Sequence, residues 1–355
     1  MILVVNAGSS SVKVALFGEG LGEVLRGAVT EIGAEGRLRV GARDQGAHAP
    51  DHEAAMSLLL RALAEAGHPA DALRAAAHRV VHGGARLTAP CRLTPEAIAA
   101  IEACAPLAPL HNPANLAGIR AIARLDPDLP QYASFDTAFH ATNTAVATTY
   151  ALPRALRDAG LRRYGFHGLS YASLVDSLAA DGPLPRRLLA LHLGNGASLC
   201  AILDGRSVAT SMGYSPLDGL VMGTRTGSID GMAVLEIARR EGIEGAQRIL
   251  NRESGLLALA GTSDMAAILA RTDADARFAV DHFCHWAVRE AGSAIAAIGG
   301  LDAIAFTGGI GENAPLVRGR IAEGLAWAGS VPVHVVKAQE ERQIAAEALA
   351  LMRDD

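Results

Sequence analysis

The sequence lacks the features that mark several classes of protein. Aromatic residues make up 4% of it, and its four cysteines are widely spaced, at Cys91, Cys104, Cys200 and Cys284. A chain of 355 residues does not need disulfides for stability, so we expect reduced core thiols. No apolar run is long enough to span a membrane, and the N-terminal apolar run is too short for a signal peptide. We therefore expect a cytoplasmic protein with no membrane partner.

Charge of either sign is not in large excess. There are 32 lysines and arginines against 37 acidic residues, for a net charge of −5. Such a balance gives no field that would attract nucleic acid, so we expect no nucleic-acid partner. Lysine is nearly absent, with only Lys13 and Lys337 among the basic residues. Any anion must therefore be bound locally.

Length and apolar content indicate two α/β domains. The chain exceeds what one core usually holds, and 50% of it is hydrophobic. Short β runs alternate with amphipathic segments, as α/β architecture requires. The patterns predict helices over residues 52–67 and 94–105 and strands over residues 76–82 and 132–135.

Proline and glycine clusters suggest the domain boundary. One cluster surrounds Leu152-Pro153, and such clusters are typical of turns and loops. We expect an N-terminal domain over residues 1–149 and a C-terminal domain over residues 150–341. A final helix over residues 342–355 is expected to return to the first domain.

The N-terminus predicts a β-hairpin with a polar tip. The apolar run Ile2–Val5 ends at the turn Asn6–Ser11 and resumes in Val12–Phe17. Gly8 leaves room for close approach, and the serines and backbone amides could cradle a phosphate. Lys13 lies just beyond the turn.

The same pattern recurs later in the chain. The apolar strand Leu188–Leu191 is followed by His192-Leu193-Gly194-Asn195-Gly196 and a second strand. Aligning Asn6 with His192 and Gly8 with Gly194 matches strand, turn and strand in both halves. The recurrence predicts two related domains, each offering a glycine hairpin to one ligand lying between them.

Two polar residues lie at or near the ends of predicted strands. Arg79, in a valine-containing strand that also holds His78 and His82, is either an anion ligand or a surface arginine. Those histidines would be about 13 Å apart in a strand, which does not favour a shared metal. Asp136 follows the strand over residues 132–135, where it could hold a magnesium shell, polarise a nucleophile or cap a helix.

Three further features favour a phosphate ligand. His167 lies among aromatic residues and glycines, although a core imidazole is the simpler interpretation, and Arg225 is flanked by glycines. The predicted strand Asp302–Thr307 leads into the glycine turn Gly308–Asn313, which can present amide donors to phosphate. Together with the hairpins and arginines, these features indicate phosphoryl transfer, in which catalysis is mainly positioning and charge neutralisation.

These motifs resemble those of the acetokinase family, the acetate and propionate kinases of the actin-like ATPase superfamily. The matching blocks run in family order through the whole chain: Asn6–Lys13, His78–Gly84, Leu107–Asn115, Phe135–His140, Tyr164–Gly168, His192–Gly196, Met222–Arg225 and Phe306–Asn313.

The resemblance implies a role for each matching residue. Asp136, His167 and Arg225 would be catalytic, and Arg79 would bind the substrate carboxylate or acyl phosphate. Asn6 and Glu340 would serve the metal, with Glu341 as the alternative to Glu340. The nucleotide would be bound by Lys13, His192, Leu193, Gly194, Asn195, Gly196, Asp264, Met265, Ala266, Gly309, Ile310, Gly311, Glu312 and Asn313.

The resemblance also implies a fold and an activity. It implies two duplicated actin-like, ribonuclease H-like domains with a nucleotide cleft between them, in a homodimer. The reaction would be reversible phosphorylation of acetate by ATP to give acetyl phosphate and ADP, with Mg²⁺ as the metal and Mn²⁺ as the alternative. The alternatives are a propionate or butyrate kinase, an actin-like ATPase switch that needs no acid, and a degenerate member that binds without turnover.

The sequence departs from the family pattern at several positions, including Ala266 and Tyr171. Ala266 stands where the family usually has an arginine beside the nucleotide, and Tyr171 stands where it has a histidine. Neither change removes a group predicted to stabilise the phosphoryl group.

Overall fold

The computed structural model describes residues 1–109 and 111–354. Leu110, within the motif at residues 107–115, and Asp355, at the end of the predicted final helix, lie outside the described residues. The chain divides into two compact units, Met1–Phe139 with Gln339–Asp355 and His140–Ala338. Each is described by itself.

The chain passes from unit 1 to unit 2 between Phe139 and His140. This point lies earlier in the chain than the boundary at residues 149/150 expected from the sequence. The segment that begins at His140 packs with strands of unit 2, because the His140 ring nitrogens lie 2.8 Å from Ser207 Oγ and 2.9 Å from the Phe166 carbonyl oxygen. The hydroxyl of Thr142 also donates to the Ser207 carbonyl.

Unit 1 is built on an eight-stranded mixed sheet of order β5-β4-β3-β2-β1-β6-β8-β7. The predicted hairpin is confirmed: β1 and β2 pair antiparallel, with Asn6 opposite Lys13. β6 and β8 continue the sheet in parallel. The strands are β1 (Ile2–Ala7), β2 (Ser11–Phe17), β3 (Glu23–Thr30), β4 (Glu35–Val40), β5 (Arg43–His48), β6 (Ala75–Val80), β7 (Cys91–Arg92) and β8 (Gln131–Phe135).

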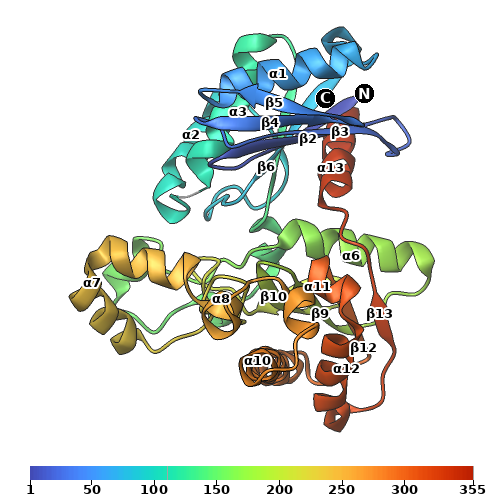
Figure 1. Cartoon of the computed structure of the whole chain (residues 1–355). Helices are drawn as coiled ribbons and strands as arrows, with labels where there is room; N and C mark the ends of the chain where they lie inside the picture. Colours follow the sequence, from blue (N-terminus) through green and yellow to red (C-terminus); the bar gives the residue numbers. More distant parts are fainter. Residues whose placement is uncertain (110, 355) are drawn as a thin grey trace. The chain divides into compact units, whose positions relative to one another are not determined.

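Helices cover both faces of this sheet (Figure 1). α1 (His52–Glu65) and α3 (Asn112–Leu125) pack against each other and against the central strands. α13 (Glu340–Asp354) packs on β1, β6 and β8. α2 (Pro95–Ala103) starts as predicted, with the Thr94 hydroxyl accepting from the Ala97 amide.

The alternation of side chains assigns the two faces of the sheet. Leu3, Val5 and Ala7 of β1 join the core cluster that contains the apolar side chains of α1. Because successive strand residues point to opposite faces, Val4 and Asn6 lie on the other face, where Glu341 of α13 lines the same hollow.

Unit 2 repeats the strand order in its own five-stranded sheet, β11-β10-β9-β12-β13. Both sheets place three antiparallel strands beside two parallel ones, as β3-β2-β1-β6-β8 does in unit 1. The α/β class with two related sheets is therefore confirmed. The strands are β9 (Arg187–Leu193), β10 (Ala197–Leu203), β11 (Arg206–Thr210), β12 (Ala303–Thr307) and β13 (Val333–Val335).

The long helix α10 packs on β9, β10 and β11, and its neighbours include α8 and α12 (Figure 1). The helices of unit 2 are α4 (Ala145–Thr148), α5 (Arg154–Asp158), α6 (Gly168–Asp181), α7 (Gly231–Arg252), α8 (Gly255–Ala260), α9 (Met265–Leu269), α10 (Ala274–Ile298), α11 (Gly308–Asn313) and α12 (Pro315–Gly324).

The four cysteines are free thiols, three of them buried and Cys91 partly so. None of the described helices combines the length and the apolar character that a membrane crossing needs.

Candidate active site

The main polar pair of unit 1 joins Arg79 and Asp136. Arg79 lies near the end of β6, and Asp136 directly follows β8. The guanidinium makes two parallel bonds to the carboxylate, Nε to Oδ1 at 3.0 Å and Nη2 to Oδ2 at 2.6 Å. Asp136 is buried, whereas 23% of the Arg79 side chain is exposed. The Arg79 guanidinium is therefore arranged to bind a carboxylate and is exposed on one side.

The pair is positioned by amides and a hydroxyl from neighbouring segments. Asn115 of α3 accepts from the Val81 amide at 3.1 Å and donates to the Ala7 carbonyl at 2.7 Å. Asn112 accepts from the His82 amide and donates to its carbonyl. Thr137 accepts from the Gly83 amide at 3.1 Å. The start of α3 thus fixes the ends of β1 and β6.

The two glutamates at the start of α13 have different neighbours. Burial raises the pKa of Glu340 to about 7, partly opposed by Arg79 and supported by the negative charges of Asp136 and Glu341. Burial works to lower the pKa of Arg79, but the carboxylates around it more than offset this and raise it above its ordinary value. Glu340 therefore belongs electrostatically to the Arg79–Asp136 pair.

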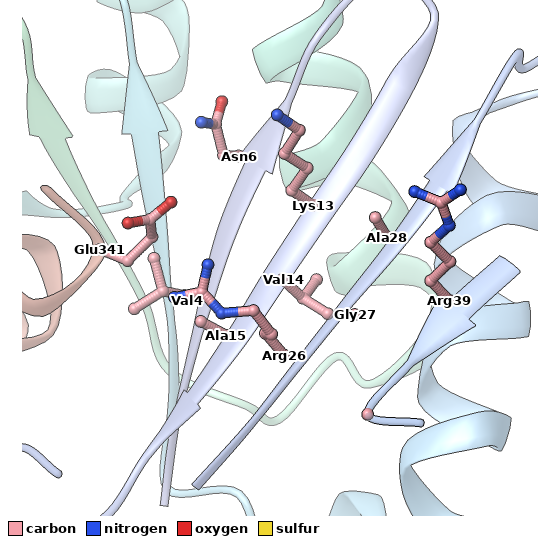
Figure 2. Close-up of a pocket in the computed structure, with 11 residues that line it drawn as sticks. Val4, Asn6, Lys13, Val14, Ala15, Arg26, Gly27, Ala28, Arg39 and Glu341 are labelled. Atoms are coloured by element: carbon pink, nitrogen blue, oxygen red, sulfur yellow. The ribbon is translucent and has the colours of Figure 1, made fainter. Parts of the chain in front are cut away.

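Glu341 instead lines a hollow with Asn6 and Lys13 (Figure 2). Asn6 and Lys13 face each other across the β1–β2 ladder, and Figure 2 shows their polar ends side by side above the sheet. The predicted metal and nucleotide residues of unit 1 are thus divided between two neighbouring groups.

The histidines of the β6 motif have separate structural surroundings. His78 Nε2 lies 2.8 Å from Gln131 Oε1, and burial lowers the pKa of His78 to about 4. His82 Nδ1 accepts from the Gly84 amide at 2.9 Å. Burial lowers the pKa of His82 to about 4 as well. Both imidazoles are neutral in the folded protein at neutral pH.

In unit 2, His167 is held in a defined orientation. It is a non-glycine residue with a left-handed backbone, φ 59°, directly before α6. Its Nδ1 lies 2.9 Å from Ser198 Oγ, and the Tyr171 hydroxyl lies 2.5 Å from the same oxygen. The ring stacks on His192 with centroids 4.3 Å apart. Ser198 and Tyr171 therefore fix which way the other ring nitrogen points.

The other ring nitrogen of His167, Nε2, lies with Arg225 at the tip of the β9–β10 hairpin. A methyl group built on Gly196 would lie 3.1 Å from His167 Nε2 and 3.6 Å from Arg225 Nη1. Arg225 Nη1 also donates to the Pro216 carbonyl at 3.0 Å. The missing side chain at Gly196 therefore brings an imidazole, a guanidinium and backbone together.

The glycine turn after β12 presses against the same hairpin. Thr307 pairs with His192 in the parallel ladder. Gly308 has φ 79°, and a Cβ there would lie 2.8 Å from the Leu193 carbonyl oxygen, so only glycine fits without strain. The next residues form α11, where the Asn313 amide donates to the Gly309 carbonyl. The Glu312 carboxylate accepts from the Ala338 amide at 3.0 Å.

The predicted segment Asp264–Ala266 lies at the start of α9. Asp264 caps this helix by accepting from the Ala266 amide at 2.9 Å. A Cβ on Gly223 would lie 2.1 Å from Asn195 Oδ1 and 3.2 Å from Ser263 Cβ. The Arg225 loop thereby connects this segment to the hairpin.

Fold and site together define a phosphotransferase of the actin-like type. A family model described as the acetokinase family matches residues 1–347. The chain is 44% identical over 348 residues to the acetate kinase of Rhodopseudomonas palustris, covering 93% of this chain and 87% of that one. It is also 44% identical over 345 residues to the acetate kinase of Deinococcus radiodurans, with 92% and 86% covered.

Solved structures agree over nearly the whole length. The acetate kinase of Porphyromonas gingivalis superposes with a TM-score of 0.92 at 32% identity, over 99% of each chain. A propionate kinase from Francisella tularensis gives a TM-score of 0.92 at 34% identity, over 98% of each chain. The chain belongs to the acetokinase family.

The residues that orient the site were given no role from the sequence, although Asn112 and Asn115 lie in the block Leu107–Asn115. Asn112 and Asn115 fix the strand ends, and Ser198 links Tyr171 to His167. An Asn-x-x-Asn pair at a helix start after a proline-braced loop was the one available signal. Ser198 lies in a hairpin strand, and no sequence signal marks it.

Proposed function

We propose that this protein transfers the γ-phosphoryl group of ATP reversibly to acetate, giving acetyl phosphate and ADP by direct in-line displacement. The observation that carries the proposal is the approach of His167 and Arg225 to Gly196. An imidazole and a guanidinium beside a bare backbone suit a phosphoryl group whose charge spreads over its equatorial oxygens. Family membership supports the same activity.

In this proposal Arg79 binds the acid. Its guanidinium already holds one carboxylate, Asp136, through two bonds. The carboxylate of acetate, or the phosphate of acetyl phosphate, offers the same pair of oxygens. Asp136 is then displaced from part of the guanidinium, and its carboxylate becomes the catalytic group that faces the reacting atoms.

His167 and Arg225 stabilise the phosphoryl group in transfer. Donors from both side chains offset the repulsion between the acid and the nucleotide, both of which are anions. Ser198 and Tyr171 act through His167 as positioning residues. The nucleotide phosphates lie against His192–Gly196 and Gly309–Asn313, where glycines expose backbone amides. Lys13 adds a charge for the phosphates, and Asp264–Ala266 lies beside the base and ribose.

The oxygen donors of unit 1 suit Mg²⁺ or Mn²⁺. Asp136, Glu340 and Glu341 are coupled electrostatically, and Glu340 has its pKa raised to about 7, which a divalent cation would relieve. Among the described residues no three histidine, cysteine or carboxylate side chains already form a cluster. Mg²⁺ typically takes one or two carboxylates together with substrate phosphates. Asn6 and Glu340 would hold the ion, and bound there it would neutralise charge on the phosphates.

Propionate is the second candidate acid, favoured by the similarity to the Francisella tularensis propionate kinase. One methylene is worth only about 1–3 kcal/mol in a hydrophobic pocket, so both acids are expected to react. Butyrate tests the upper size limit.

The test is ADP release from MgATP without acid and with acetate, propionate or butyrate, trapping the acyl phosphate with hydroxylamine. We expect ADP release that requires acid and yields trapped product. Arg79→Gln should raise the KM for acid by about a hundred-fold, whereas Arg120→Gln, an exposed arginine paired with Glu102, should not. ADP release without acid would favour an ATPase switch. Absence of turnover would favour a degenerate family member that binds ligand without reaction.

We also propose a homodimer. Exposed apolar side chains gather on α7, where Met232, Leu235 and Ile243 are each more than half exposed, and apolar patches of this kind mark interfaces. Light scattering should give twice the monomer mass. Leu235→Glu should reduce it, and an unchanged mass in that variant would remove α7 from the interface.

A further inference from the structure

The open part of the unit 1 sheet carries a hollow of about 350 Å³ (Figure 2). It lies over β1 to β4, with Glu341 of α13 as one wall. Its floor is made of small residues, Ala15, Gly27 and Ala28. The volume is at the lower end of the range for small-molecule sites.

Strand register explains why cations surround this floor. Lys13 pairs with Ala28, and Ala28 pairs with Arg39, so these three side chains share one face. In the adjacent row Ala15 pairs with Arg26. Small side chains thus alternate with long basic ones across three strands. At about 4.8 Å between strands, Lys13 and Arg39 start about 10 Å apart.

The guanidinium groups are oriented from the rim. Glu23 pairs with Arg26 along β3. Asp44 of β5 accepts from Arg39 Nε at 3.1 Å and from Arg37 Nε at 2.9 Å. Each pair uses only part of the guanidinium. Exposed pairs of this kind contribute little to stability, so a ligand can compete for them.

The Lys13 side chain makes no hydrogen bond or ion pair with any described residue, whereas its backbone pairs with β1 and β3. Figure 2 shows Lys13 and Arg39 on opposite sides of Ala28, while Arg26 extends toward Glu341. Glu341 is the one acidic side chain among the lining residues and faces Arg26. Three positive groups therefore surround a floor without acidic side chains.

We propose that this hollow binds a compact inorganic oxyanion with more than one charge, a short phosphate chain, at Lys13, Arg26 and Arg39. The lining contains no aromatic side chain on which a nucleobase could stack, which favours an inorganic anion over a nucleotide. The separation of Lys13 and Arg39 across Ala28 favours a chain over a single phosphate. Arg79 and Asp136 do not line the hollow, so this site is separate from the proposed acid site, and Lys13 is the one cation that it shares with the proposed nucleotide site.

The test is isothermal titration with inorganic tripolyphosphate and with inorganic phosphate, in metal-free buffer that also contains EDTA. We expect saturable binding of tripolyphosphate, tighter than that of phosphate. Arg39→Gln and Ala28→Glu should each weaken it by about ten-fold or more. Arg37→Gln is the matched control, because Arg37 shares Asp44 with Arg39 but does not line the hollow.

Three results would overturn the proposal. One is the absence of saturable binding. Another is an equal loss in Arg37→Gln, which would indicate general surface charge. The third is a KM for ATP that rises in Arg39→Gln in parallel with the loss of tripolyphosphate binding, because the hollow would then belong to the nucleotide site. The titration does not depend on turnover. If the protein bound tripolyphosphate but showed no kinase activity, the proposed function would be refuted and the oxyanion site would stand.

Discussion

The side chains proposed to be catalytic are restricted by their neighbours. His167 has a left-handed backbone, a serine at one ring nitrogen and a histidine stacked on its face. Arg225 is tied to a backbone carbonyl through Nη1. Both are thereby held ready before any ligand arrives, and such preorganised donors are the largest contribution to many transfer reactions.

Replacing Arg225 tests this contribution. Arg225→Ala removes a charged donor from the phosphoryl group, and we expect kcat to fall about 10²- to 10³-fold with the fold unchanged. Steady-state kinetics and circular dichroism measure the two effects. Arg248→Ala, which breaks an exposed pair with Glu253, should leave kcat unchanged. Near-normal turnover in Arg225→Ala would remove the residue from catalysis.

Gly196 tests the spacing between the same groups. Gly196→Ala puts a methyl group 3.1 Å from His167 Nε2, so the imidazole or the hairpin must shift. We expect kcat to fall roughly ten- to a hundred-fold, because small displacements of positioned groups are costly. Gly231→Ala, where a Cβ would meet open space, is the control. Equal kinetics for the two variants would contradict the proposed convergence.

At the scale of elements, the start of α3 acts as a clamp. Asn115 alone joins the end of β1 to the residue after β6, and both its partners are backbone groups. Backbone donors and acceptors in a buried place must be satisfied. The clamp therefore contributes to stability and also holds the strand that carries Arg79.

Removing this amide should affect both. Asn115→Ala leaves a buried amide and a buried carbonyl unpaired, and we expect a loss of about 2–3 kcal/mol in the free energy of unfolding. The KM for acyl phosphate should rise as well. Gln247→Ala, on the exposed surface of α7, should cost less than about 0.5 kcal/mol. Urea denaturation and initial rates measure the two effects, and unchanged stability in Asn115→Ala would show that water replaces the amide.

Sequence patterns predicted the elements whose apolar runs are continuous and missed those that are half polar. Ile2–Val5 and Leu188–Leu191 marked β1 and β9, and both hairpins are confirmed. β4 was missed: Arg37 and Arg39 alternate with Leu38, so only a few buried residues mark the strand. β4 pairs with β3 in a local antiparallel hairpin, so the alternation of polar and buried residues was the available signal.

The candidate site was predictable to a similar extent. Glycine turns and strand ends identify Asp136 and Gly196 by local pattern. The different surroundings of Glu340 and Glu341 could not be predicted from the sequence. Successive helix residues point about 100° apart, and the packing of α13 decides which of the two glutamates faces Arg79. The Tyr171–Ser198–His167 chain joins residues far apart in sequence.

At the scale of the whole molecule, the two sheets share a strand order but not a size. The unit 1 sheet adds β4, β5 and β7 to the common five strands. The common part positions the glycine hairpins, and the additional strands β4 and β5 supply Arg39 and Asp44. The duplicated core therefore accounts for the proposed phosphoryl chemistry, and the extension accounts for the proposed oxyanion site.

The pH dependence of stability should reflect the buried histidines of unit 1. Burial lowers the pKa of His78 from 6.5 to about 4, so between these values the unfolded chain binds a proton that the folded protein does not. Stability therefore falls as pH drops from about 6.5 to about 4, by up to about 3 kcal/mol for this residue, and levels off below. His82, with its pKa also lowered to about 4, adds to the same slope.

His78→Gln should flatten the slope, because glutamine keeps a polar group near Gln131 and cannot titrate. Urea unfolding at about pH 7 and about pH 5 measures the difference in free energy for each variant. The comparison uses the change with pH rather than the absolute stability, so a general loss in the variant does not affect it. An equally steep loss in His78→Gln would mean that other groups take up the protons, and the buried neutral imidazole would then not limit acid stability.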